Sequence, residues 1–259
     1  MTSVARLRVY PVKALDGTDV EQAQITEGGS LAGDREFAMF GPEGEPVNGK
    51  RTTRVHDLDA SFDPERKTLS AVAGDGPTMD HRTFDLETDR ESAEDWLSAF
   101  FDIDVTLRRN TKTGFPDRPD FGPSVISTAT LEEVASWFDE VTVDGLRRRL
   151  RANVEVEGVE PFWEDRFLGP DAPAFEIGSV RFEGVKPCGR CVVPERDPDT
   201  GERDPDFRER FVERRRETFP EWANEDAFEH LYAVMLIADV PEDFRGRTVR
   251  VGEEVQISE

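Results

Sequence analysis

The sequence predicts a mainly β protein with a few helices, an α+β chain, and the spacing of its apolar residues is the main reason. Apolar and polar residues alternate in short runs, as over 4–10, 20–25 and 35–40, and glycine or proline separates the runs. Alternation over four to eight residues is typical of half-buried strands, and frequent breaks favour many short strands. The chain ends on two further strands around a glycine turn, over 248–257.

Three helices are expected, each near a residue that can cap a helix. One begins near Ser92 and carries apolar residues at helical spacing. A second begins at Thr130, where Thr130 and Glu133 match a capping box. Asp206 could cap a third, through about Thr218, and its run of Arg and Glu is interpreted as a solvated face with ion pairs.

The length of 259 residues suits two domains. Residues 111–123 are rich in Pro, Asp and Gly and form the best candidate linker. We place the domain boundary there, which gives a first unit of residues 1–118 and a second of 119–259.

The net charge of -23 limits the possible partners. A field of that sign repels nucleic acid phosphates and anionic lipids, so neither a nucleic acid nor a membrane is expected as a partner. Only five of the 33 basic residues are lysine and the acidity is spread along the whole chain, which is the pattern of a halophilic, salt-adapted protein. No apolar run approaches the ~20 residues that span a bilayer and no signal peptide is evident, so we expect a cytoplasmic protein.

Both cysteines, Cys188 and Cys191, stand in one segment beside Lys186 and Arg190. We expect Val192 and Val193 to continue as strand, unlike the helix that follows a thioredoxin-type pair. None of the three histidines stands at finger spacing from the pair, which disfavours a closed zinc site. A thiolate beside positive charge suits a metal that arrives in an anionic cofactor with its own sulfur ligands. Two buried cysteines that act as small hydrophobes are the alternative.

Several motifs now point to one family. In chain order they are Val9–Lys13 with Gly17, Gly33–Arg35, Ser127–Leu131, Arg149–Asn153, the cysteine pair followed by Asp197–Gly201, and Val251–Val255. In this order and spacing the chain resembles the MOSC-domain proteins that also carry a MOSC N-terminal β-barrel domain. The resemblance implies a MOSC N-terminal β-barrel-like unit over 1–118 and a MOSC β-barrel domain over 119–259.

The resemblance also implies a molybdenum cofactor, a molybdenum ion held by the dithiolene of a phosphate-bearing pterin. Cys191 would be the metal ligand and the catalytic residue, and Cys188 would be structural.

The resemblance implies seven cofactor-binding residues. They are Lys13, Arg35, Ser127, Thr128, Arg149, Arg151 and Asn153. This assignment agrees with the forked Arg donors that match phosphate oxygens and with the helix N-terminus beside Ser127 and Thr128. Surface ion pairs for Arg35 and Arg149 and simple helix caps for Ser127 and Thr128 are the alternatives. Two positions depart from the family: Ala14 replaces a small hydroxyl residue that relatives often have, and Ala152 replaces a proline.

The function that the resemblance implies is a molybdenum cofactor-dependent oxidoreductase. It would reduce small N-hydroxylated or other N-oxygenated compounds, with electrons from a separate ferredoxin- or cytochrome-like protein. A molybdenum cofactor carrier or sulfur-transfer module that uses Cys191 is the main alternative, and a plain cofactor-binding protein is a third.

The acidity generates a first testable prediction. Fold and activity should be lost at low ionic strength, because carboxylate repulsion in a chain of charge -23 is screened only by concentrated cations. Circular dichroism and thermal melting over a KCl series measure this. A spectrum and melting temperature that stay unchanged down to millimolar salt would refute the halophilic interpretation.

Overall fold

The computed structural model describes residues 1–74, 79–117 and 122–258. The strands and few helices in this part of the chain confirm the expected α+β class. The expected boundary between residues 118 and 119 lies outside the described residues.

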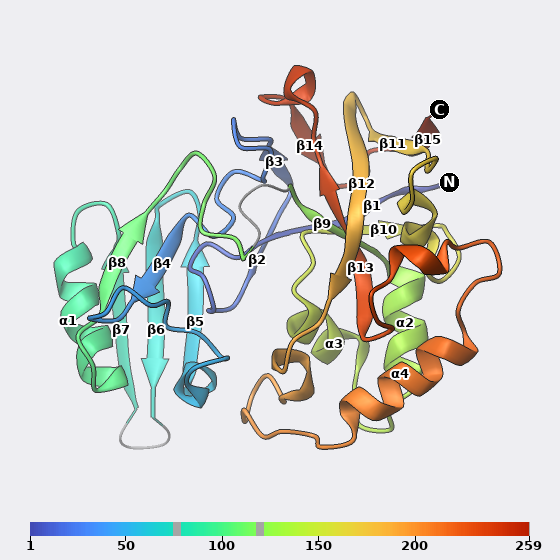
Figure 1. Cartoon of the computed structure of the whole chain (residues 1–259). Helices are drawn as coiled ribbons and strands as arrows, with labels where there is room; N and C mark the ends of the chain where they lie inside the picture. Colours follow the sequence, from blue (N-terminus) through green and yellow to red (C-terminus); the bar gives the residue numbers. More distant parts are fainter. Residues whose placement is uncertain (75–78, 118–121, 259) are drawn as a thin grey trace.

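An eight-stranded sheet organises the larger half of the molecule (Figure 1). Its strand order is β15-β11-β12-β13-β9-β10-β1-β2. The strands are β1 (Ser3–Val9), β2 (Thr18–Val20), β9 (Ser124–Ser127), β10 (Val154–Glu157), β11 (Ala174–Ile177), β12 (Val180–Gly189), β13 (Ala233–Asp239) and β15 (Val255–Ser258). Strand β1 pairs with β10, so the start of the chain lies in the same sheet as the C-terminal half.

A second group of strands forms the smaller half, on the left in Figure 1. A three-stranded sheet contains β5 (Leu58–Asp63), β6 (Thr68–Ala73) and β7 (Asp80–Asp85), and β4 (Phe37–Phe40) pairs with β8 (Thr106–Arg109). Helix α1 (Arg90–Phe101) packs on this half and buries Ala93, Leu97 and Phe101 in its core. The expected strand over 20–25 is split, because β2 ends at Val20 and β3 (Gln22–Gln24) pairs instead with β14 (Thr248–Arg250).

The second expected helix, α2 (Thr128–Ser136), begins earlier than the capping box indicated. Its N-cap is Ser127, whose hydroxyl accepts a hydrogen bond from the Thr130 amide at 3.0 Å. The Thr130 assignment was therefore wrong, because Thr130 is fully buried and its hydroxyl donates to Glu164 at 3.1 Å.

Helix α4 (Phe207–Glu217) confirms the third expected helix, although the Asp206 side chain makes no capping hydrogen bond. The solvated-face interpretation of its charges holds for the exposed pair of Arg214 and Glu217. It fails for Arg215, which is fully buried and pairs with the buried Asp165. Phe207 and Phe211 complete the face that packs into the core beside α2.

Two local features differ from the sequence expectations near the cysteines. Strand β12 ends at Gly189, and a short 3-10 helix, η4 (Val193–Glu195), follows Cys191. The expected continuation of the strand was therefore wrong. Helix α3 (Val143–Leu150) was not expected, although Thr142 caps it by accepting a hydrogen bond from the Gly145 amide at 3.0 Å.

The remaining short helices are 3-10 turns, namely η1 (Thr53–Asp57), η3 (Trp163–Phe167), η5 (Glu225–Ala227) and η6 (Glu242–Phe244). Within the described residues, no helix is both long and apolar enough to traverse a bilayer.

The carboxyl of Glu164, in η3, is buried under α2. Burial, together with the neighbouring Asp165, raises its pKa to about 8 from an ordinary value of 4.5. The folded protein thus holds a proton there that the unfolded chain releases above pH 4.5. This group stabilises the fold fully below that pH and loses its contribution as the pH rises towards 8.

Glu164→Gln mimics the protonated carboxyl and should remove this pH dependence. We expect its melting temperature to exceed that of the unmodified protein increasingly between pH 5 and pH 9, by roughly 5 °C or more at the upper end. Thermal melts of both proteins at fixed high salt measure the difference. A difference that stays constant over this range would contradict the assignment.

Candidate functional site

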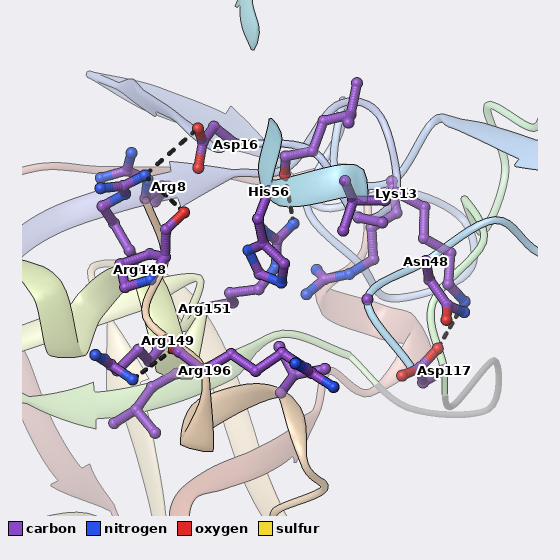
Figure 2. A pocket seen from close by; sticks show the side chains of 18 of the residues that line it. Arg8, Lys13, Asp16, Asn48, His56, Asp117, Arg148, Arg149, Arg151 and Arg196 are labelled. Atoms are coloured by element: carbon purple, nitrogen blue, oxygen red, sulfur yellow. Dashed lines mark hydrogen bonds and ion pairs between the residues drawn. The ribbon is translucent and has the colours of Figure 1, made fainter. Parts of the chain in front are cut away.

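A pocket of about 820 Å³ is lined by both halves of the molecule. The smaller half contributes residues 48–50 and 55–59, and the large-sheet half contributes the end of α3 and the loop that follows β12. Figure 2 shows several of its charged side chains turned towards one another from these walls. A volume of this size can hold a cofactor or a drug-sized ligand.

The pocket is basic within an acidic chain. Nine Lys and Arg residues line it against six Asp residues in the described part of the chain. The sequence has six stretches of ten or more residues without Asp or Glu, and every one of them contributes to the lining. These stretches are 1–15, 46–56, 105–116, 121–131, 145–154 and 184–194. The fold thus gathers its carboxylate-free segments at one place, where they create a local field that attracts anions.

The two cysteines differ in their surroundings. Cys188 is 3% exposed, packs in the core with α2 and α4, and its sulfur accepts a hydrogen bond from Arg190 at 3.0 Å. Cys191 lies just beyond the end of β12, is half-buried and lines the pocket. The geometry therefore makes Cys191 the more accessible thiol.

Arg151 follows α3 in a left-handed conformation with φ of 61° and closes that helix. Its guanidinium stacks over the Tyr10 ring at 4.1 Å and donates to the Leu15 carbonyl at 2.7 Å. Burial lowers the pKa of Arg151 to about 10, so it stays protonated at neutral pH. Within the described residues no carboxylate forms an ion pair with it, although Asp16 and Asp34 act on it from a greater distance.

Arg35 and Lys13 stand on the same side of the pocket. Arg35 lies 5.0 Å from the Tyr10 ring centroid and pairs with Asp34. Lys13 reaches Asp117 at 2.6 Å, and Lys50 reaches the other oxygen of that carboxylate at 3.0 Å. Although burial opposes it, hydrogen bonding to the two lysines holds the pKa of Asp117 well below its usual range.

Arg149 and Asn153 line the pocket but mainly hold its walls together. Arg149 is 8% exposed, donates to the Pro194 and Arg196 carbonyls, and pairs with Asp197 at 3.1 Å. Asn153 accepts from both the amide and the hydroxyl of Ser124 at 3.1 Å and donates to the Arg8 carbonyl.

Ser127 and Thr128 are not brought to this pocket. Ser127 is fully buried as the cap of α2, and the Thr128 hydroxyl donates to Glu155 at 2.9 Å. The structure therefore joins Cys191, Lys13, Arg35, Arg149, Arg151 and Asn153 in one site and leaves these two hydroxyl residues outside it. Their expected role in cofactor binding stays a prediction that the geometry does not support.

Sequence reasoning did not assign six basic lining residues of the described chain to the site. They are Arg8, Lys50, His56, Arg148, Arg190 and Arg196. Their signal was the absence of neighbouring carboxylates, since Lys50 and His56 lie in stretch 46–56 and Arg190 lies in 184–194. Nothing in the sequence around Arg196, which follows Glu195 and precedes Asp197, distinguished it from a surface ion-pair partner.

Comparison with known proteins identifies the family. The model of the MOSC N-terminal beta barrel domain matches residues 1–144, and the model of the MOSC domain matches residues 118–256. The chain belongs to the MOSC family. Family membership supports a function related to the molybdenum cofactor, as the motifs indicated.

The curated relatives carry one type of name. Mitochondrial amidoxime-reducing component 1 of Mus musculus is 25% identical over 242 residues, which cover 77% of this chain and 67% of the relative. The Homo sapiens component 1 is 26% identical over 235 residues, with the same shares. Mitochondrial amidoxime reducing component 2 of Bos taurus is 25% identical over 236 residues, covering 77% of this chain and 68% of the relative.

The residues present fit a phosphate-bearing, anionic cofactor. The Nε atoms of Arg149 and Arg190 are buried and have no hydrogen-bond partner among the described residues. A buried donor without an acceptor costs free energy, and the oxygens of an anionic ligand can supply the missing acceptors. The Cys191 thiol, as thiolate, is a suitable ligand for a metal that brings its own sulfur ligands.

The role of Arg149 in holding the pocket walls together can be tested by substitution. Arg149→Gln should lower the melting temperature by about 5–10 °C, because hydrogen bonds from a charged group are worth about 1.5–3 kcal/mol each. Arg148→Gln, on the same helix, is the matched control, since its partner Asp199 is largely exposed and such pairs contribute about 0–1 kcal/mol. Equal losses in the two variants would contradict the wall-forming role of Arg149.

Proposed function

We propose that this protein is a molybdenum cofactor-dependent oxidoreductase that reduces N-oxygenated compounds. Its electrons would come from a separate ferredoxin- or cytochrome-like donor protein. The protein would be located in the cytoplasm. The observation that carries the proposal is the half-buried Cys191 thiol at a strongly basic pocket, in a chain similar to amidoxime-reducing components.

The basic residues provide the anion-binding part of the site. Lys13, Arg35 and Arg151 would hold the phosphate of the cofactor, since guanidinium and ammonium groups are the strongest phosphate donors in proteins. Arg151 is best placed, because a neutral carbonyl oxygen and an aromatic ring fix its position while its charge stays available. Cys191 would supply the protein thiolate to the metal.

When bound, the cofactor supplies the two-electron redox chemistry. Reduction of an N-hydroxylated compound consumes two electrons and two protons and releases water: R–NH–OH + 2 e⁻ + 2 H⁺ gives R–NH₂ + H₂O. The pocket walls would hold the substrate, and solvent would supply the two protons. The residues of this chain thus contribute positioning and electrostatics.

Two cysteine variants test the metal assignment. Cys191→Ala should abolish turnover and remove most of the bound molybdenum, because Cys188, which also lines the pocket, is only 3% exposed and packs in the core. Cys188→Ala should keep most of both and lose some stability, since it creates a small cavity in a packed core. The measurements are metal content and benzamidoxime reduction with a chemical electron donor, on protein made at high salt in a host that builds the cofactor.

The outcomes separate the possible functions. Equal loss of molybdenum in both variants would contradict the assignment of Cys191 and indicate a two-cysteine site. Bound molybdenum without turnover in the unmodified protein would support a plain cofactor-binding or carrier protein. Cyanide-labile sulfur without tightly bound molybdenum would support a sulfur-transfer module.

A further inference from the structure

Arg196 and His56 face the pocket from opposite sides. Figure 2 shows His56 on the ribbon of the smaller half and Arg196 on the ribbon of the loop after β12. His56 belongs to η1, and Arg196 follows η4 by one residue. The motifs that assign the cofactor-binding residues include neither of them.

Each of these side chains carries a buried polar atom without a partner. The Arg196 Nε and the His56 Nε2 make no hydrogen bond within the described part of the chain. Among the described residues, the Arg196 guanidinium donates to the Gly201 carbonyl alone, at 3.0 Å from Nη1. A Cβ placed on Gly49 would lie 3.5 Å from His56 Nε2, so the missing side chain leaves space beside the ring.

Arg196 acts electrostatically on His56. Burial and then the Arg196 charge lower the pKa of His56, while the Pro198 carbonyl, Asp57 and Asp16 act in the opposite direction and do not outweigh them. Asp199, which also lines the pocket, pairs with Arg148 at 2.5 Å. Within the described residues no carboxylate pairs with Arg196.

We propose that Arg196 and His56 form a second anion subsite, which binds a carboxylate or phosphate group on the substrate. An anion between the two side chains would accept a hydrogen bond from the Arg196 Nε and, once the ring is protonated, from the His56 Nε2, and it would relieve the repulsion between the guanidinium and that protonated ring. The proposal rests on the proposed function for its substrate, and it restricts that substrate to N-oxygenated compounds that carry an anionic group.

This subsite is separate from the one assigned to the cofactor phosphate. Lys13, Arg35 and Arg151 gather around Tyr10 and Asp117. Arg196 is held instead by the turn at Gly201. The two groups of cations can therefore hold two anionic groups at once, one on the cofactor and one on the substrate.

The binding test uses the protein without cofactor and inorganic phosphate as the probe. The imidazole proton signals of the three histidines are followed by NMR against pH, with and without phosphate, at constant ionic strength. Phosphate should raise the pKa of His56 by roughly one unit, since an opposite charge within about 4–6 Å favours the charged ring. The exposed His81 and His230 are internal controls and should not move.

Variants test which basic side chains are needed for the phosphate-induced shift in the pKa of His56. Arg196→Gln should abolish the phosphate-induced shift of His56, whereas Arg151→Gln should keep it. Arg66→Gln is the matched control, because its side chain is 84% exposed on the β5–β6 turn. The proposal is overturned if phosphate does not change the pKa of His56. It is also overturned if the phosphate-induced shift persists in Arg196→Gln, whether or not the melting temperature of that variant is lower. Should Arg196→Gln fail to fold, His56→Gln takes its place, with phosphate affinity measured by calorimetry and expected to fall about tenfold.

A kinetic test follows with the cofactor-loaded protein. Arg196→Gln should lower kcat/KM for 4-carboxybenzamidoxime about tenfold and leave benzamidoxime within about twofold. Equal losses for both substrates would overturn the subsite. If neither substrate is reduced, the proposed function fails, while the NMR result still decides whether the anion subsite exists.

Discussion

Hydrogen bonds from guanidinium groups to neutral backbone carbonyls hold this site together. Arg151 donates to Leu15, Arg190 to Leu150 and Arg196 to Gly201. A carboxylate partner would fix these side chains equally well but would cancel their charge. A carbonyl fixes the position and leaves the charge in place, so the pocket stays basic in a chain of net charge -23.

Contacts between segments that are far apart in the sequence also build the basic pocket. Strand β1 crosses into the large sheet and brings the segment that contains Lys13 beside Arg151. Arg149 joins α3 to the loop after β12, which carries Cys191. The accessible thiol and the cations thus share one pocket, although they come from segments far apart in the sequence.

Much of the site could be predicted from the sequence because its residues lie in short motifs. The motifs located Cys191, Lys13, Arg35, Arg151 and Asn153, all of which line the pocket. Ser127 and Thr128 lie outside the pocket, and a serine before a helix has the same local pattern whether it caps that helix or faces a ligand. The difference depends on which side of the strand–helix turn faces the pocket, which is a tertiary property.

Other features could not be predicted because distant parts of the chain decide them. The buried pair of Arg215 and Asp165 lies in an arginine-rich helix that is otherwise solvated, and only the packing of η3 against α4 reveals it. Helix α3 was hidden by its consecutive arginines, which obscure an apolar face of Leu146 and Leu150. His56 and Arg196 came together only through the contact of the two halves.

The central claim is that Cys191 is the protein ligand of a molybdenum cofactor held in the basic pocket. X-ray absorption at the molybdenum edge of the loaded protein tests it most directly, by counting sulfur ligands. We expect one sulfur ligand fewer in Cys191→Ala, measured on whatever molybdenum that variant retains, and an unchanged number in Cys188→Ala. The same sulfur count in Cys191→Ala and the unmodified protein would contradict it.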